Sequence, residues 1–160
     1  RAPERTFQLL VQVAGRAGRG DRTGEVVVQT YTPFEPPIQF AKRAEYAEFY
    51  EAEMQNRREL AYPPFRHVIR HVFKGRNPEK TAFFAEQWAR RVEEAFGQSV
   101  ELRGPAPAPL EKAKDFYRFH LWTFCDTVMP VAEKMAKLRE DFPNDPDVQD
   151  TFDVDPIDVL

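Results

Sequence analysis

The sequence predicts an α+β fold whose C-terminal part is a ferredoxin-like, split βαβ domain: a four-stranded antiparallel sheet with two helices on one face. After Phe65 the elements follow in the order strand, helix, strand, strand, helix, strand, and clusters rich in Gly, Pro and Asn separate them. An apolar fraction of 42% and 14 Phe are enough for a packed core. The residues before this domain have the pattern of the last helix and strand of an α/β domain.

That first part contains signals for one helix, one glycine-rich turn and one strand. Residues 5–14 have apolar side chains at helix-like spacing. The run Val26, Val27 and Val28 is typical of a strand buried on both faces of a parallel sheet. One helix and one strand cannot bury their apolar faces alone, so we expect an excised fragment whose upstream part is missing. For the same reason we expect residues 1–40 to be poorly ordered or differently packed.

A proline-rich crossing and a connector helix join the two parts. Residues 32–40 hold three prolines and are predicted to form a linker or an ordered extended crossing. Residues 41–60 are rich in helix formers, and their aromatic residues at helical spacing predict an amphipathic helix. The predicted organisation is 1–34 for the end of the first domain, 35–62 for linker and connector helix, and 63–160 for the C-terminal domain.

Glycine and proline mark the elements of the C-terminal domain. Gly75 stops the first strand, and Asn77-Pro78 has the pattern of an N-cap followed by proline at the first helical position. Pro130 falls in the first turn of the second helix, where proline is tolerated. The predicted strands are 66–75, 99–103, 115–124 and 148–154, and the predicted helices begin near residues 78 and 128.

Composition narrows the classes of function. The net charge of −3 argues against a nucleic-acid module that works by bulk charge, so any DNA contact requires a local basic patch. Cys125 is the only cysteine, so no internal disulfide can form and a reducing, cytoplasmic compartment is the default. No apolar run approaches the length of a membrane span and no signal peptide is evident, so no membrane partner is expected.

One string carries chemistry: Gln12, Gly15, Arg16, Gly18 and Arg19 follow one another as Gln-x-x-Gly-Arg-x-Gly-Arg. We expect its two Gly-Arg pairs on a turn after the first helix. Glycine lets the backbone approach a ligand closely, and arginine offers a planar fork of donors that matches phosphate oxygens. A lone Gly-Arg pair would be interpreted as a basic surface loop.

The complete string resembles motif VI of superfamily-2 helicases. With GEVVVQTY, RREL-YPPF, GPAPAPLEK, YRFHL and the terminal DVDP, the chain resembles the primosomal protein N′ (PriA) family over essentially its whole length. The resemblance places residues 1–34 at the end of the second RecA-like helicase lobe. It implies that Arg16 and Arg19 sense the γ-phosphate of ATP, with Gln12, Gly15 and Gly18 near the nucleotide.

The resemblance also implies the function of the complete protein. It would be an ATP-dependent 3′→5′ DNA helicase that recognises stalled or branched replication forks and restarts replication by assembling the primosome. ATP with Mg²⁺, and zinc elsewhere in the protein, would be its cofactors. Forked DNA, single-stranded-DNA-binding protein and other primosome proteins would be its partners, at the bacterial nucleoid in the cytoplasm. This chain contains no Walker A sequence and too few cysteine and histidine residues for a structural zinc site, so we expect it to be inactive alone.

Two basic sets could contact DNA. The candidates are Lys112, Lys114, Tyr117 and Arg118, because cations neutralise phosphates and aromatic rings can stack on unpaired bases. The neighbouring Trp122 and Phe124 are predicted to be core residues.

The second set, Arg66, Arg70, Lys74 and Arg76, follows one predicted strand. It could form an exposed sheet edge or pair with the glutamates of residues 45–59, and we favour a solvated, structural role. Arg57 and Arg58 are expected to pack against a helicase lobe.

The remaining polar residues favour structural roles. His67, His71 and His120 are interpreted as ordinary strand positions, and Cys125 as a small buried residue. Asp153 and Asp155 are expected in a turn or in a salt bridge to the helicase core. Three hypotheses stay open: part of a helicase, a module that binds forked DNA or the acidic tail of single-stranded-DNA-binding protein, and a buttress without DNA contact.

Overall fold

The computed structural model describes residues 2–17 and 24–157, and the chain divides into two compact units, Arg1–Glu59 and Leu60–Leu160. The division falls one residue before the end of the predicted connector helix, residues 41–60. Within the described residues, no helix has both the length and the apolar character that a membrane crossing needs. The finer predicted division at residues 34 and 62 stays a prediction.

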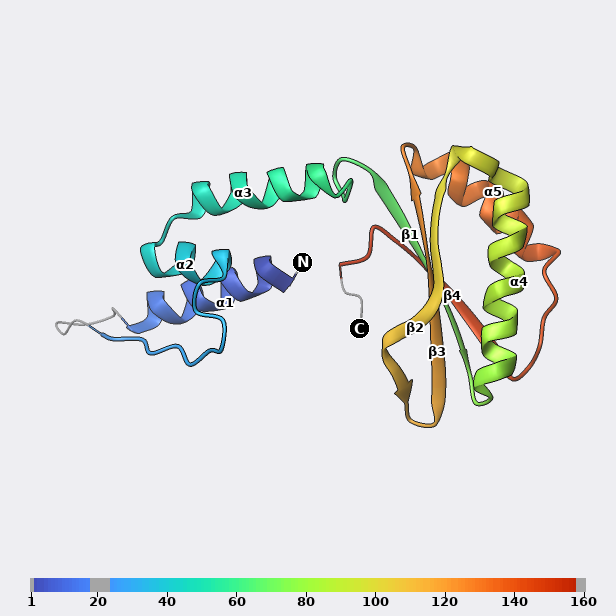
Figure 1. The fold of residues 1–160 in the computed structure, drawn as a ribbon, viewed down its shortest axis with the longest axis horizontal. Coiled ribbons are helices and arrows are strands. Elements are labelled where there is room, and N and C mark those ends of the chain that lie inside the picture. The colour runs from blue at the N-terminus through green and yellow to red at the C-terminus, as the bar shows by residue number, and fades with distance from the viewer. Residues whose placement is uncertain (1, 18–23, 158–160) are drawn as a thin grey trace. The chain divides into compact units, whose positions relative to one another are not determined.

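The described part of the first unit is helical (Figure 1). Its helices are α1 (Ala2–Ala17), α2 (Pro36–Arg43) and α3 (Tyr46–Glu59). A small core holds them together: Phe7, Ala41 and Phe49 are buried, and the rings of Phe7 and Phe49 stack with centroids 4.2 Å apart. The single predicted connector helix is therefore two helices, separated where Ala44 adopts a left-handed conformation.

Two sequence predictions for this unit are wrong. Part of the expected linker is helix α2, because Pro36 lies in the first turn, where a missing backbone N–H costs nothing. Val26, Val27 and Val28 form no strand, and Val27 is 85% exposed. A buried parallel strand needs partner strands on both sides, and the described residues of this unit supply none.

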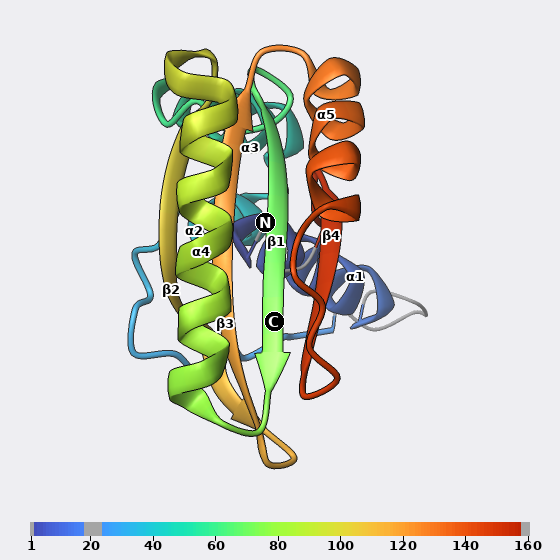
Figure 2. The same cartoon turned by 90° about the vertical axis from the view of Figure 1, so that its right-hand side faces the viewer.

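The second unit has the predicted ferredoxin-like order of elements. Its sheet is antiparallel, with the strand order β2-β3-β1-β4. Helices α4 and α5 both cover the same face of this sheet, and none of the unit's described helices covers the other face (Figures 1 and 2). The elements are β1 (His67–Gly75), α4 (Pro78–Phe96), a short 3-10 turn (Gly97–Ser99), β2 (Glu101–Ala113), β3 (Phe116–Cys125), α5 (Val128–Glu140) and β4 (Val148–Val154).

Strand β2 is longer than predicted and includes the Gly-Pro-rich stretch. It is an edge strand, the place in a sheet where proline is tolerated because no neighbour needs its N–H. Its register with β3 shifts between Arg103 and Ala106, and Gly104 between them has a φ of 102°. The Gly-Pro-rich cluster that was expected to separate two elements is therefore an irregularity inside one strand.

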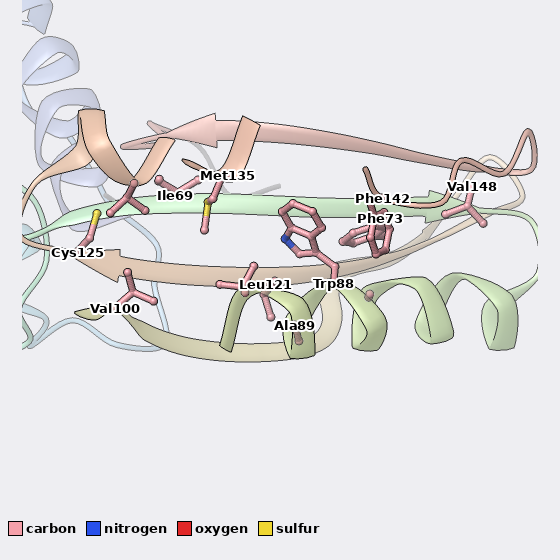
Figure 3. Close-up of a cluster of buried hydrophobic side chains, with 13 residues drawn as sticks. Ile69, Phe73, Trp88, Ala89, Val100, Leu121, Cys125, Met135, Phe142 and Val148 are labelled. Carbon is pink, nitrogen blue, oxygen red and sulfur yellow. The ribbon is translucent and has the colours of Figure 1, made fainter. Parts of the chain in front are cut away.

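The core of this unit lies between the sheet and the two helices (Figure 3). Trp88 from α4 is fully buried and meets Phe142 edge-on, with ring centroids 5.1 Å apart. The start of α4 is fixed as predicted, because the Asn77 side chain accepts a hydrogen bond of 3.0 Å from the Lys80 backbone. Cys125 is buried in this core, which confirms the expectation for it.

Candidate nucleic-acid interface and arginine motif

The described part of the arginine motif lies on a helix and not on a turn. Gln12, Gly15 and Arg16 belong to the last turns of α1, so the expected turn at Gly15 and Arg16 is wrong, whereas Gln12 lies on a helix as predicted. Gln12 and Arg16 are exposed and stand four residues apart, so both side chains leave the same side of the helix. Such an exposed guanidinium suits a phosphate oxygen. Gly18 and Arg19 lie outside the described residues.

Three of the four predicted DNA contacts, Lys112, Lys114 and Tyr117, lie at the turn end of the β2–β3 hairpin. Lys112 is the register partner of Tyr117, and its Nζ lies 5.3 Å from the ring centroid and 4.0 Å from the Asp115 carboxylate. Lys114 is exposed in the turn, with a φ of 49°. The hairpin therefore presents Lys112 and Tyr117 together, with Lys114 at its tip.

Arg118 belongs to the opposite face of the same hairpin. Side chains alternate along a strand, so Arg118 and Tyr117 leave opposite faces of β3. The Arg118 Nε and Nη2 both donate to the carbonyl of Leu110, at 2.8 and 2.6 Å, which holds the guanidinium against β2. The register partner of Arg118 on β1 is Lys74. The four predicted contacts are thus divided between two surfaces.

One of the two sequence interpretations of the second basic set, an exposed sheet edge, is wrong. Strand β1, which carries most of the set, lies between β3 and β4. Arg66 pairs with Glu101 at 2.7 Å and with Asp126 at 3.2 Å. In the helical unit, Arg57 pairs with Glu4 and Glu53, both at 2.8 Å.

Aromatic rings accompany the cations on the helix-free face. The Lys74 Nζ lies 4.5 Å and the Arg76 Cζ 5.4 Å from the ring centroid of Phe116. Arg70 lies 5.5 Å from the ring centroid of Trp122, which is half-buried on this face and absent from the core cluster. The prediction that Trp122 is a core residue is therefore wrong. Phe124 is buried, as predicted.

A buried polar cluster links β1, β4 and α5. The His71 Nε2 lies 2.9 Å from the Asp150 carboxylate, to which the Arg139 Nε donates at 2.7 Å. Burial alone would raise the pKa of Asp150, but the hydrogen bonds from His71 and Arg139 outweigh it and hold that pKa at about 2. Burial lowers the pKa of His71. His71 is therefore a buried member of a polar cluster and not an ordinary strand position. The sequence signal that could have found it is Asp150, an acidic residue within a predicted strand.

The C-terminal aspartates tie the chain to its own sheet. Asp155 accepts a hydrogen bond of 2.9 Å from the Val68 backbone and lies 2.8 Å from the His67 ring. Asp155 lies in a bend directly after β4, which agrees with the expected turn, and these two partners belong to the second unit. Within residues 2–17 and 24–157, no group of three or more His, Cys, Asp or Glu residues could hold a metal ion.

The chain matches the family model described as primosomal protein N C-terminal domain over residues 58–157. It is similar to the replication restart protein PriA of Bacillus subtilis, with 40% identity over 119 residues, which cover 74% of this chain and 15% of the relative. The Synechocystis protein of that name is 35% identical over 159 residues, or 99% of this chain and 19% of the relative. The chain therefore spans less than a quarter of these relatives' length.

Among solved structures, the designed protein Foldit4 is similar to 56% of this chain and 94% of its own, with 16% identity and a TM-score of 0.44, too low to support any argument. The family match covers the complete sheet and both helices of the second unit. This chain belongs to the primosomal protein N C-terminal domain family, and its relatives from Bacillus subtilis and Synechocystis are replication restart proteins.

Proposed function

We propose that this chain is the C-terminal part of an ATP-dependent 3′→5′ DNA helicase that recognises stalled or branched replication forks and restarts replication by primosome assembly. The observation that carries the proposal is the similarity to replication restart proteins along 99% of the chain. ATP with Mg²⁺ and zinc would be bound with the rest of the protein, in the bacterial cytoplasm at the nucleoid. The chain itself would contribute arginines to the ATPase and a DNA-docking module.

In the ATPase, Arg16 and Arg19 would neutralise charge that develops on the γ-phosphate during hydrolysis. The exposure of Gln12 and Arg16 on one side of α1 supports this role, because both side chains are free to meet a nucleotide. Arginines in this position contribute several kcal/mol by acting on the transition state more than on bound ATP.

The test uses the full-length protein that contains this sequence. Arg16→Ala and Arg19→Ala should each lower kcat of DNA-stimulated ATP hydrolysis by roughly 10³-fold or more. The KM for ATP should change little, since the contact acts mainly in the transition state. Lys42→Ala on α2, which removes an exposed cation that is not part of the motif, is the control. Retention of ATPase activity by both arginine variants would refute the proposed role.

The second unit would dock forked DNA through the β2–β3 hairpin. Lys112, Lys114 and Arg118 supply cations, and Tyr117 supplies a ring that could stack on an unpaired base. Single-stranded-DNA-binding protein and other primosome proteins are the proposed protein partners. The 160-residue chain should bind labelled forked DNA with an affinity that falls steeply with salt.

The matched variants are Lys112→Ala/Arg118→Ala and, on the helical face, Arg90→Ala/Lys137→Ala, which removes the same charge. The hairpin pair should weaken binding of the fork at least about tenfold and flatten its salt dependence. Arg90→Ala/Lys137→Ala should leave the affinity for the fork and its salt dependence nearly unchanged. Equal effects of the two pairs would mean that net charge alone matters, and would refute docking by the hairpin.

A second candidate is a structural buttress that makes no DNA contact. The net charge of −3 and the neutralisation of Arg66 by Glu101 and Asp126 favour it. Absence of any salt-sensitive binding by the unaltered chain would establish this candidate in place of the docking module.

A further inference from the structure

The face of the sheet that no helix of the second unit covers carries cations and aromatic rings in register. On β1, Lys74 lies directly across from Arg118 of β3, and Arg70 lies across from Trp122. His120 lies between these two positions on β3, with its ring 5.4 Å from that of Trp122. Because neighbouring strands lie about 4.8 Å apart, these side chains form one continuous strip.

One end of the strip is a cluster of three cations around the half-buried ring of Phe116. Lys74 and Arg76 both lie over this ring, and Arg118 is bound to the carbonyl of Leu110. No carboxylate within residues 2–17 and 24–157 forms an ion pair with Lys74, Arg76 or Arg118. Three neighbouring positive charges without an acidic partner favour an anion.

The other end of the strip is closed by the protein's own acidic groups. Glu101 pairs with Arg66 and with Arg103, both at 2.7 Å, over the buried ring of Phe124. On β4, Asp153 is the register partner of Arg70. The charge of the strip therefore differs between its two ends. It is positive around Phe116, whereas beyond Trp122 the basic side chains have acidic neighbours.

We propose that this strip is a platform for single-stranded DNA. Its phosphates would be held by Lys74, Arg76 and Arg118, and its unpaired bases would stack on Trp122, with the ring of His120 next to Trp122. From Phe116 to Trp122 the strand spans about 20 Å. RNA-recognition domains, whose four-stranded sheets stack two or three bases on aromatic side chains, use a face of the same kind. A duplex would hide its bases, so the rings favour an unpaired strand.

The platform deepens the proposed docking of forked DNA and rests on it: the hairpin would hold the branch, and the unpaired arm would lie along the strip. The two surfaces make separate demands on the ligand. The hairpin requires a branch point, whereas the strip requires only unpaired nucleotides. A plain single-stranded probe therefore tests the strip without the fork.

The first measurement is tryptophan fluorescence of the 160-residue chain during titration with a thymidine oligonucleotide of roughly 15 nucleotides. The chain has two tryptophans: Trp88 is fully buried, and Trp122 is half-buried on the strip. Stacking should quench the fluorescence of Trp122. Trp122→Phe keeps a ring and should bind within about threefold of the wild-type affinity by anisotropy, but without the quench.

The second measurement compares affinities for the same labelled oligonucleotide. Trp122→Ala should weaken binding by roughly 5- to 100-fold. Lys74→Gln/Arg76→Gln should also weaken it, and should lower the slope of log affinity against log salt by about 1.4, since each phosphate contributes about 0.7 on a single strand. Arg90→Gln/Lys137→Gln on the helical face is the matched control and should leave the slope unchanged.

The outcomes separate the two proposals. Binding of forked DNA that depends on Lys112 and Arg118 but is indifferent to Trp122, Lys74 and Arg76 would overturn the platform and leave the docking module intact. Quenching by the single strand, lost in Trp122→Phe, would support the platform even if the fork bound no better than the single strand. Binding of the oligonucleotide without any change in tryptophan fluorescence would also overturn it.

Discussion

Acid should lower the free energy of unfolding of the second unit, because protonation of Asp150 removes the interactions of its carboxylate. The carboxylate side chain is 9% exposed and its pKa is held at about 2, against a usual value of 3.8. Because the folded pKa is the lower one, the unfolded chain binds the proton first as pH falls. The stabilisation is complete above about pH 5, and the gap between the two pKa values corresponds to about 2.5 kcal/mol.

Asp150→Asn, which mimics the protonated carboxyl, should therefore lower the free energy of unfolding by about 2.5 kcal/mol at neutral pH. The difference in the free energy of unfolding between this variant and wild type should be smaller than at neutral pH by about 1 kcal/mol at pH 3 and by about 2 kcal/mol at pH 2. Urea unfolding followed by tryptophan fluorescence measures it, since Trp88 and Trp122 both lie in the second unit. Asp141→Asn, at an exposed helix end, should change the free energy by less than about 0.5 kcal/mol.

His71 titrates beside Asp150 and needs its own control. Burial lowers its pKa, so its contribution is present above the usual value of 6.5 and is lost as pH falls below it. Measuring the Asp150→Asn difference again in a His71→Gln background removes this titration. A difference that stays constant from neutral pH to pH 3 in both backgrounds would refute the account of the cluster.

Two further predictions concern close packing. Gly75→Ala should destabilise the second unit by about 1–3 kcal/mol in urea unfolding, because the added Cβ would lie 2.4 Å from the Thr81 hydroxyl and 2.9 Å from the Asp147 carbonyl. Gly15→Ala, where the added Cβ meets open space in a helix, is the control and should not destabilise. Burial raises the pKa of the Cys125 thiol, so a thiol reagent should label it slowly in the native chain and rapidly in urea, and rapid native labelling would contradict its burial.

The fold of the second unit was predictable because its signals are local. Gly75, Asn77 and Pro78 end one strand and begin a helix within four residues. The order of six such elements then fixes a split βαβ arrangement with few alternatives. The prediction failed where the outcome depends on neighbours distant in sequence. Val26–Val28 were predicted to form a strand but have no partner strand among the described residues of their unit, and the second strand, predicted to end at residue 103, continues to Ala113 along the edge of the sheet.

The surfaces were less predictable than the fold, because register decides them. Alternation assigns each residue of a strand to one of two faces, but it does not say which residue of the next strand lies alongside. Lys74 meets Arg118, and His71 meets Asp150, only because β1 lies between β3 and β4 in this register. Trp122 was wrongly predicted to be a core residue for the same reason. A strand of aromatic residues has two faces, and its sequence does not say which face the helices cover.

Net charge is a poor guide to a strip of this kind, because it averages over the whole chain. Acidic residues gather elsewhere, as in α3, whose sequence contains Glu48, Glu51, Glu53 and Glu59. Salt screens an exposed charge to a large extent beyond about 10 Å, whereas side chains that contact a ligand act on it directly. The overall charge of −3 therefore bears on long-range attraction of DNA and on the rate of encounter. Whether a bound strand stays in place depends on the few cations and rings that contact it.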